Sequence, residues 1–381
     1  MLLLTENVAS QDQIMLADGV IDTTDEWSLG LQPEDGVETF TIFMPNDTTD
    51  HYSNGVVMAA FGEKLYCMWQ SSPTDEDSDD TWVACSQSED GGQTWCPPQA
   101  LALPTDTTYC TSGGWMVRGD TLIALIDTWR KGLNPRGGET HYIMTTDGRT
   151  WSERKPLLMA DGTAMKGVLE QDPCQLPSGR MVGASHFQPG LHVCPVFTDD
   201  PTGLTGWTKA IFLPLPTKEA DSKQSRELEP SQFVQADGTL VMTFRDQQSS
   251  FRKLASFSHD DGHSWSVPVV TAIPDARTKQ CAGNLSDGTA FMVSCPADGK
   301  RRWPLLLFLS RDGRLFDRAV LLRSGASTDL PLRRYEGKAK TLGYSYPKAM
   351  VSQGCLYVGY STNKETVECT RIPLSLIQTG L

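Results

Sequence analysis

The chain has 381 residues, of which 39% are hydrophobic, and a formal net charge of −14 at pH 7. This is enough apolar material for a substantial core, while the acidic balance argues against nucleic acid, itself a polyanion, as a partner. The ten cysteines and six histidines are scattered, without CxxC pairs or metal-type spacing. We therefore expect buried free thiols in a reducing compartment, with no metal and no cofactor.

The first ten residues, MLLLTENVAS, contain three leucines but no basic segment and no long apolar stretch. They lack the features of a signal peptide or a membrane span. We therefore expect no membrane association, and a protein that is cytoplasmic, or secreted with its signal already removed. The next β-prone run is ETFTIFM, at 38–44.

A short motif with Asp and Gly before an aromatic residue then recurs along the chain. Its copies are SEDGGQTW (88–95), TTDGRTW (145–151), the looser TDDPTGLTGW (198–207), SHDDGHSW (258–265) and SRDGRLF (310–316). Asp and Gly favour a tight hairpin turn, and each motif follows an apolar, β-prone run such as TWVACS or KLASFS. Each motif therefore predicts a strand, a hairpin and another strand.

The terminal aromatic residues are spaced by 51 to 58 residues, which is typical of a repeat architecture. Four-stranded units that repeat at this period predict an all-β, six-bladed β-propeller of antiparallel blades, forming one domain over residues 1–381. Five motifs give five blades. Segments within 340–376 give the sixth, which a strand at about 36–45 would close; five or seven blades remain alternatives by counting alone. The hairpin aspartates are predicted to be structural and far from the functional mouth of the ring.

The inner strands are predicted from segments that read as strand, Gly-containing turn and strand. They lie at 172–184, 229–244, 280–294 and 346–360. The starts of these segments should approach the axis together, and they hold Glu170, Asp172, Glu229 and Tyr344.

The hairpins, their spacing and the C-terminal segment resemble the sialidase (neuraminidase) superfamily over roughly residues 50 to 375. The resemblance implies an exo-acting glycoside hydrolase that cleaves a terminal sialic acid or a related acidic sugar. It implies a tyrosine nucleophile activated by a glutamate, an aspartate as acid/base, and three arginines that hold the substrate carboxylate.

By this resemblance Tyr344, in GYSYPKAMVSQGCLYVGYS, is the nucleophile and Glu229 is its activator. Asp80, with its neighbour Asp79, matches the acid/base. Two members of the arginine clamp are matched as well. They are Arg245 and Arg302, the latter with its neighbour Arg301.

One arginine of the family pattern is missing. The segment HYSNGVVMAAFGEKLYCMW (51–69) stands where an Arg-Ile-Pro segment is usual, and it contains no arginine. Arg130 and Arg136, in TWRKGLNPRGG, are the candidates to replace it. Without a substitute, the acidic group of the substrate must be placed differently.

Two other functions remain open at this point. Glu170 and Glu229 occupy similar places in successive blades and could form a two-carboxylate site for a neutral sugar, as in sialidase-like arabinanases. Alternatively, the propeller binds a glycan or a protein without catalysis. Trp69, Trp82 and Trp129 are candidates both for sugar stacking and for core packing. In each case we expect a monomer, and the first reading gives it a glycan or sialoglycoconjugate substrate.

Overall fold

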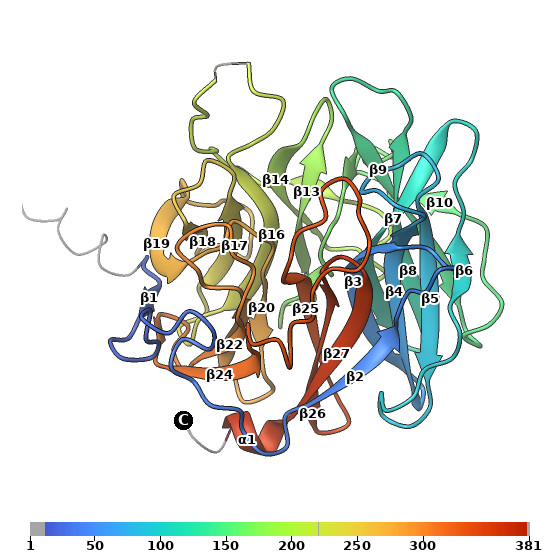
Figure 1. The fold of residues 1–381 in the computed structure, drawn as a ribbon. Coiled ribbons are helices and arrows are strands. Elements are labelled where there is room, and N and C mark those ends of the chain that lie inside the picture. Colours follow the sequence, from blue (N-terminus) through green and yellow to red (C-terminus); the bar gives the residue numbers. More distant parts are fainter. Residues whose placement is uncertain (1–11, 220, 379–381) are drawn as a thin grey trace, which may run out of the picture.

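The computed structural model describes residues 12–219 and 221–378. It is a β-propeller of six antiparallel sheets, as predicted (Figure 1). The first blade consists of β3 (Tyr52–Phe61), β4 (Lys64–Ser72), β5 (Trp82–Ser88) and β6 (Gln99–Ala102). The second consists of β7 (Thr108–Arg118), β8 (Thr121–Arg130), β9 (Gly138–Thr145) and β10 (Lys155–Pro156). The third consists of β11 (Gly167–Val168), β12 (Cys174–Gln175), β13 (Met181–Phe187), β14 (His192–Thr198) and β15 (Thr208–Lys209).

The last three blades follow the same order from the axis outward. They are β16 (Glu227–Val234), β17 (Leu240–Asp246), β18 (Arg252–Ser258) and β19 (Val269–Pro274); β20 (Cys281–Asn284), β21 (Ala290–Ser294), β22 (Leu305–Ser310) and β24 (Arg318–Arg323); and β25 (Tyr344–Ser352), β26 (Cys355–Thr362), β27 (Thr366–Pro373) and β2 (Glu38–Phe43).

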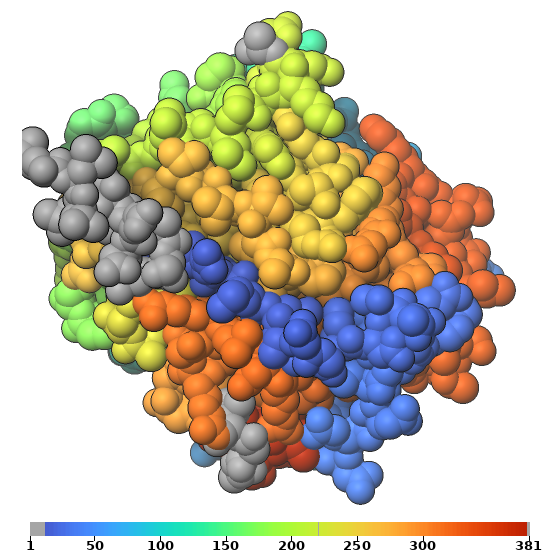
Figure 2. All heavy atoms as spheres, turned by 90° about the vertical axis from the view of Figure 1, so that its left-hand side faces the viewer, coloured from blue at the N-terminus to red at the C-terminus, as the bar shows by residue number. Residues whose placement is uncertain are grey.

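The N-terminal part of the chain closes the ring. β2 pairs with β27 and forms the outer strand of the sixth blade, which confirms the strand predicted at about 36–45. Before β2, the chain runs across the outside of the neighbouring blades, where β1 (Met15–Leu16) pairs with β23 (Leu315–Phe316) (Figure 2). The described helix, α1 (Leu374–Gln378), follows β27. Helices in the described part of the chain are too short to span a bilayer.

The recurring hairpins are structural turns. Asp90 accepts hydrogen bonds from the backbone N–H and hydroxyl of Thr94, and the Trp95 indole donates to the Gly92 carbonyl at 2.9 Å. The Trp265 indole bonds the Gly262 carbonyl in the same way, at 3.1 Å. Each hairpin begins where the third strand of its blade finishes. It therefore lies on the face of the propeller where the inner strands finish, opposite the face where they begin.

The inner strands are irregular at the end where they begin. Their pairing with the second strand shifts between Asn54 and Val57, between Ser112 and Gly114, between Leu228 and Ser231, and between Ser345 and Lys348. Such bulges turn a side chain away from the alternating pattern of a regular strand. Four blades therefore carry re-aimed side chains at one end of the central channel.

All ten cysteines are unpaired. Six of them are buried, as expected, whereas Cys96 is exposed and three others are partly buried.

Candidate active site

A cavity of about 370 Å³ opens at the end of the channel where the inner strands begin. It is lined by the starts of β3, β7, β16 and β25, by the ends of second strands, and by loops from several blades. Most of its charged side chains come from blades that are far apart in the sequence. The basic ones are Arg136, Arg245, Lys279, Arg302 and Lys364, and the acidic ones are Glu76, Asp77, Glu170 and Glu229.

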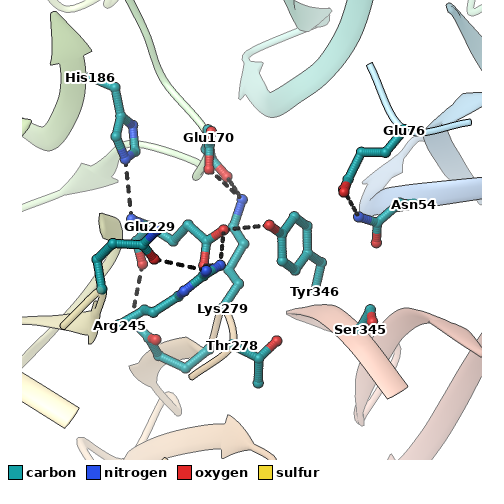
Figure 3. A network of polar contacts seen from close by, with 12 residues as sticks. Asn54, Glu76, Glu170, His186, Glu229, Arg245, Thr278, Lys279, Ser345 and Tyr346 are labelled. Atoms are coloured by element: carbon teal, nitrogen blue, oxygen red, sulfur yellow. Dashed lines mark hydrogen bonds and ion pairs between the residues drawn. The ribbon is translucent and has the colours of Figure 1, made fainter. Parts of the chain in front are cut away.

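Glu229 and Tyr346 form the centre of this cavity (Figure 3). The Tyr346 hydroxyl donates a short hydrogen bond to Glu229 Oε1, and Arg245 Nη1 lies 3.1 Å from the same oxygen. Burial and the charge of Glu229 raise the pKa of Tyr346 well above its usual value. Burial opposes ionisation of Glu229, but Arg245 and Lys279 outweigh it and lower this pKa to about 2. At neutral pH the pair is a carboxylate that holds a neutral phenol.

Several of the lining residues have a left-handed backbone. The φ angles are 54° at Glu229, 56° at Tyr346, 59° at Asp77 and 54° at Lys364. This conformation disfavours side chains larger than glycine and costs about 1–3 kcal/mol per residue, so it persists only where the surrounding structure enforces it. Its concentration around one cavity is a mark of a functional site that is independent of any pairing of charges.

The expectation that Tyr344 reaches this cavity is wrong. Tyr344 is fully buried, its hydroxyl donates to the Ser324 carbonyl at 2.8 Å, and its ring packs edge-on against Tyr360. The bulge between Ser345 and Lys348 turns Tyr346 into the cavity instead. The role that the sequence suggested for Tyr344 therefore passes to Tyr346 as a candidate.

Asp79 and Asp80 do not line the cavity either. Both are exposed, and Asp80 accepts a hydrogen bond from the Ser78 hydroxyl within the same loop. Asp77 lines the cavity instead, and Arg136 binds both of its carboxylate oxygens, with Nη2 at 2.7 Å from Oδ1. Burial raises the pKa of Asp77, and the charge of Arg136 reduces this effect without cancelling it. The acidic run at 73–80 forms a loop, as predicted. Within it, the left-handed backbone of Asp77 turns this residue, rather than Asp79 or Asp80, towards the cavity.

Glu76, which precedes Asp77, also lines the cavity but contacts a different set of side chains. It accepts hydrogen bonds from the Tyr52 hydroxyl at 2.8 Å and from Lys364 Nζ at 2.7 Å. Burial opposes its ionisation, but Lys364 outweighs burial and lowers its pKa.

Both arginines matched to the clamp, Arg245 and Arg302, face the cavity. Arg245 donates to Glu229 and, at 2.8 Å, to Gln247. Arg302 donates to the Ser345 hydroxyl at 2.8 Å, and within the described residues it forms no ion pair. Its neighbour Arg301 pairs with a glutamate of the N-terminal segment, Glu26, at 2.9 Å, and does not line the cavity.

Of the two candidates for the missing arginine, Arg136 lines the cavity and stacks over Trp129, whereas Arg130 is exposed and lines a different cavity. Lys364, which also lines the cavity, was not among the residues predicted from the sequence. Its carbonyl accepts a hydrogen bond from the Ser53 N–H at 3.0 Å, so it lies beside the strand start where the family arginine is absent. The signal was the pair Asn363–Lys364 between two strands, since Asn favours the left-handed turn that both residues adopt.

Glu170 lies on the opposite side of Lys279 from the tyrosine (Figure 3). Lys279 Nζ bonds the Glu170 carbonyl at 2.6 Å and lies 3.4 Å from its Oε2. Burial opposes ionisation of Glu170, but Lys279 outweighs it and lowers the pKa. The Glu229 N–H donates to His186 Nε2 at 3.1 Å, which fixes the strained backbone of the central glutamate. Among the residues described, no group of three or more His, Cys, Asp or Glu is arranged to hold a metal ion.

Comparisons with known proteins agree with this architecture. The family model described as "BNR repeat-like domain" matches residues 63–358, so the chain belongs to this family. Similar solved structures include a sialidase (17% identity, TM-score 0.67, covering 95% of this chain and 35% of its own) and the Hadza microbial sialidase Hz136 (14%, 0.68, 89% and 69%). Another is the Trypanosoma rangeli sialidase in complex with sialic acid (14%, 0.60, 96% and 60%).

At these identities the structural likeness establishes the fold, which is a sialidase-like BNR-repeat propeller. The chain spans about a third of the length of the first of these sialidases. The comparison with curated proteins returned no match.

Proposed function

We propose that this protein is an exo-acting glycoside hydrolase that removes a terminal sialic acid or a related acidic sugar. The observation that carries the proposal is the hydrogen bond from the Tyr346 hydroxyl to Glu229, inside a cavity that also presents Arg245 and Arg302. A neutral phenol held by a carboxylate is a nucleophile with its base already in place.

The substrate class follows from the charges. The cavity has five basic and four acidic lining residues in a protein whose net charge is −14. Four of the basic residues pair with the four carboxylates, and Arg302 has no acidic partner among the residues that the structure describes. An arginine of this kind suits a carboxylate, to which it can donate two parallel hydrogen bonds. Arg245, adjacent to the nucleophile, can share that group.

In the first chemical step, the Tyr346 oxygen attacks the anomeric carbon and its proton passes to Glu229. The raised pKa of Tyr346 and the lowered pKa of Glu229 keep the proton on the phenol until the new bond forms. An uncharged nucleophile also avoids repulsion by a carboxylate on the reacting carbon. Asp77, whose pKa burial raises, is the candidate that protonates the departing oxygen and then takes a proton from water in the second step.

The two-carboxylate alternative has less support. Glu170 and Glu229 both have lowered pKa values because Lys279 and Arg245 lie beside them. Neither carboxyl group is therefore suited to donate a proton near neutral pH, as one of the two must in conventional glycoside hydrolysis.

The experiment makes the same substitution at two tyrosines that lie two residues apart, giving Tyr346→Phe and Tyr344→Phe. Turnover is measured on aryl glycosides of sialic acid, of related ulosonic acids and of arabinose. We expect turnover of an acidic sugar that falls by at least about 10²-fold in Tyr346→Phe, since the nucleophile is lost. Tyr344→Phe should keep its turnover and lose only the stability of one hydrogen bond, about 0.5–1.5 kcal/mol. Turnover of the arabinoside alone would favour the neutral-sugar alternative, and turnover of none would favour a binding protein.

A further inference from the structure

A second cavity, of about 450 Å³, lies between the sixth and the first blade. The end of β2, the segment that follows it, and strands β4 and β5 form its walls. It is lined by Phe43, Asp47, Thr48, Thr49, Asp50, Trp69, Ser71, Trp82, Ala84 and Pro98. None of these residues lines the candidate active site.

Aromatic rings form one part of this second cavity. Trp69 stacks on Phe43, with ring centroids 5.7 Å apart, and Trp82 is partly exposed. Trp69 is fully buried, yet its indole nitrogen has no hydrogen-bond partner among the described residues. Because this nitrogen is closed to solvent, Trp69 supports the wall of the cavity, and the partly exposed Trp82 ring is the aromatic surface that a ligand can reach.

A carboxylate is fixed beside these rings. Asp50 Oδ2 accepts hydrogen bonds from the Trp82 indole at 2.6 Å and from the Ser71 hydroxyl at 2.8 Å. These two bonds orient both the carboxylate and the Trp82 ring. Within the described part of the chain, Asp50 Oδ1 accepts no hydrogen bond, so it remains available to a hydroxyl donor.

The charge of the lining selects among ligands. Among the described residues it includes Asp47 and Asp50 and no Lys, Arg or His, in contrast to the candidate active site, where basic residues outnumber acidic ones. An anionic ligand would meet two carboxylates without a compensating charge. A neutral sugar meets the requirements of the site, since its C–H groups can pack on the negative face of an indole while its hydroxyls donate to a carboxylate. We propose that this cavity is a binding site for a neutral pyranose.

The two cavities open at the same end of the first blade. Gln70 lines the active cavity, whereas its neighbours Trp69 and Ser71 line the second one, because successive side chains of β4 point to opposite faces. Hence the neutral sugar can be a free monosaccharide or a unit of a longer glycan. The inference does not depend on catalysis, because binding is measured without turnover.

The test uses ligand-observed NMR titrations with two probes, methyl β-glucopyranoside and methyl β-galactopyranoside. We expect saturable binding of at least one glycoside to the wild type. Trp82→Ala and Asp50→Ala should each weaken it by about tenfold or more, since each removes a contact to the ring or to a hydroxyl. Trp27→Ala is the matched control, because Trp27 is exposed and lies outside the cavity. Trp27→Ala should bind the neutral glycoside as tightly as the wild type does. The same holds for Arg302→Ala, because Arg302 lies in the other cavity.

Thr48→Arg provides a second route if Trp82→Ala does not fold. Thr48 is exposed on the segment after β2, so an arginine there can enter the cavity towards Asp50 without disturbing the core. It should abolish binding of the neutral glycoside. Absence of saturable binding by both glycosides, or equal affinity in Trp82→Ala, Asp50→Ala and Thr48→Arg, would overturn the proposal. Displacement of a bound glycoside by free sialic acid would contradict the preference for a neutral sugar.

Discussion

Arg302 and Arg301 are adjacent in the sequence but face different surroundings. Arg302 lines the active cavity without an acidic partner among the described residues, while Arg301 pairs with Glu26 on the outside. The contrast gives a test of carboxylate recognition. Arg302→Ala should weaken binding of an acidic sugar by about one to two orders of magnitude, the value of a charge-assisted hydrogen bond, whereas Arg301→Ala should not. Inhibition constants for free sialic acid and its carboxyl-reduced analogue check this, because the preference for the acid should shrink in Arg302→Ala and persist in Arg301→Ala.

Asp77 and Asp80 form a second matched pair, three residues apart in one loop. If Asp77 protonates the leaving group, Asp77→Asn should slow cleavage of a natural glycosidic linkage by about 10²–10⁴-fold. It should spare an aryl glycoside whose leaving group needs no proton. Asp80→Asn should match the wild type on both substrates, because Asp80 is exposed outside the cavity. Equal losses on both substrates in Asp77→Asn would argue for a binding role instead.

The same two carboxyl groups predict the pH dependence. Glu229 must be ionised, and its pKa of about 2 means that activity and its stabilising ion pair are lost only as the pH falls towards that value. Asp77 must be protonated, and its pKa is raised by burial, so activity should fall as the pH rises through that raised pKa. In the wild type, the profile of kcat/KM against pH should show this alkaline limb with a natural linkage and lose it with an aryl substrate whose leaving group needs no proton. Retention of that limb would assign it to another group.

At the scale of elements, the hairpins and the bulges differ in how far the sequence predicts them. The hairpins are local, since Asp, Gly and the aromatic residue lie within eight positions, and the turns that the sequence predicts are present. The bulges depend on pairing between two strands, which the sequence of one strand does not reveal. For this reason the sequence predicts Tyr344 in the cavity, whereas the structure shows that Tyr346 lines it. In the acidic loop, Asp77 with its left-handed backbone lines the cavity rather than Asp80.

The hairpin aromatic residues should affect stability rather than chemistry. Trp265 is buried, with 6% of its surface exposed, so Trp265→Ala should lower the free energy of unfolding by about 3–5 kcal/mol. Denaturant titration measures this loss. Turnover per folded molecule should be unchanged, because the hairpin lies at the other end of the propeller from the cavity. Loss of turnover at unchanged stability would contradict the structural role.

At the scale of the molecule, the period in the sequence predicts a propeller, and the sheets of the structure, with β2 paired to β27, establish six blades. That period could not predict Lys364, which enters the cavity from a buried left-handed turn between β26 and β27. Ring closure brings residues from distant blades together, so the site depends on the whole propeller. The resemblance predicts the kinds of residue expected at such a site, and the structure shows which residues line the cavity.

The central claim is that Tyr346 is the nucleophile. The most direct measurement is to trap the glycosyl-enzyme with a fluorinated acidic sugar that forms the intermediate but hydrolyses slowly, and to locate the adduct by peptide mass spectrometry. We predict a single adduct on Tyr346, absent from Tyr346→Phe and unaffected in Tyr344→Phe. An adduct on Glu170, Glu229 or Tyr344, or turnover of the acidic sugar that persists undiminished in Tyr346→Phe, would contradict the account.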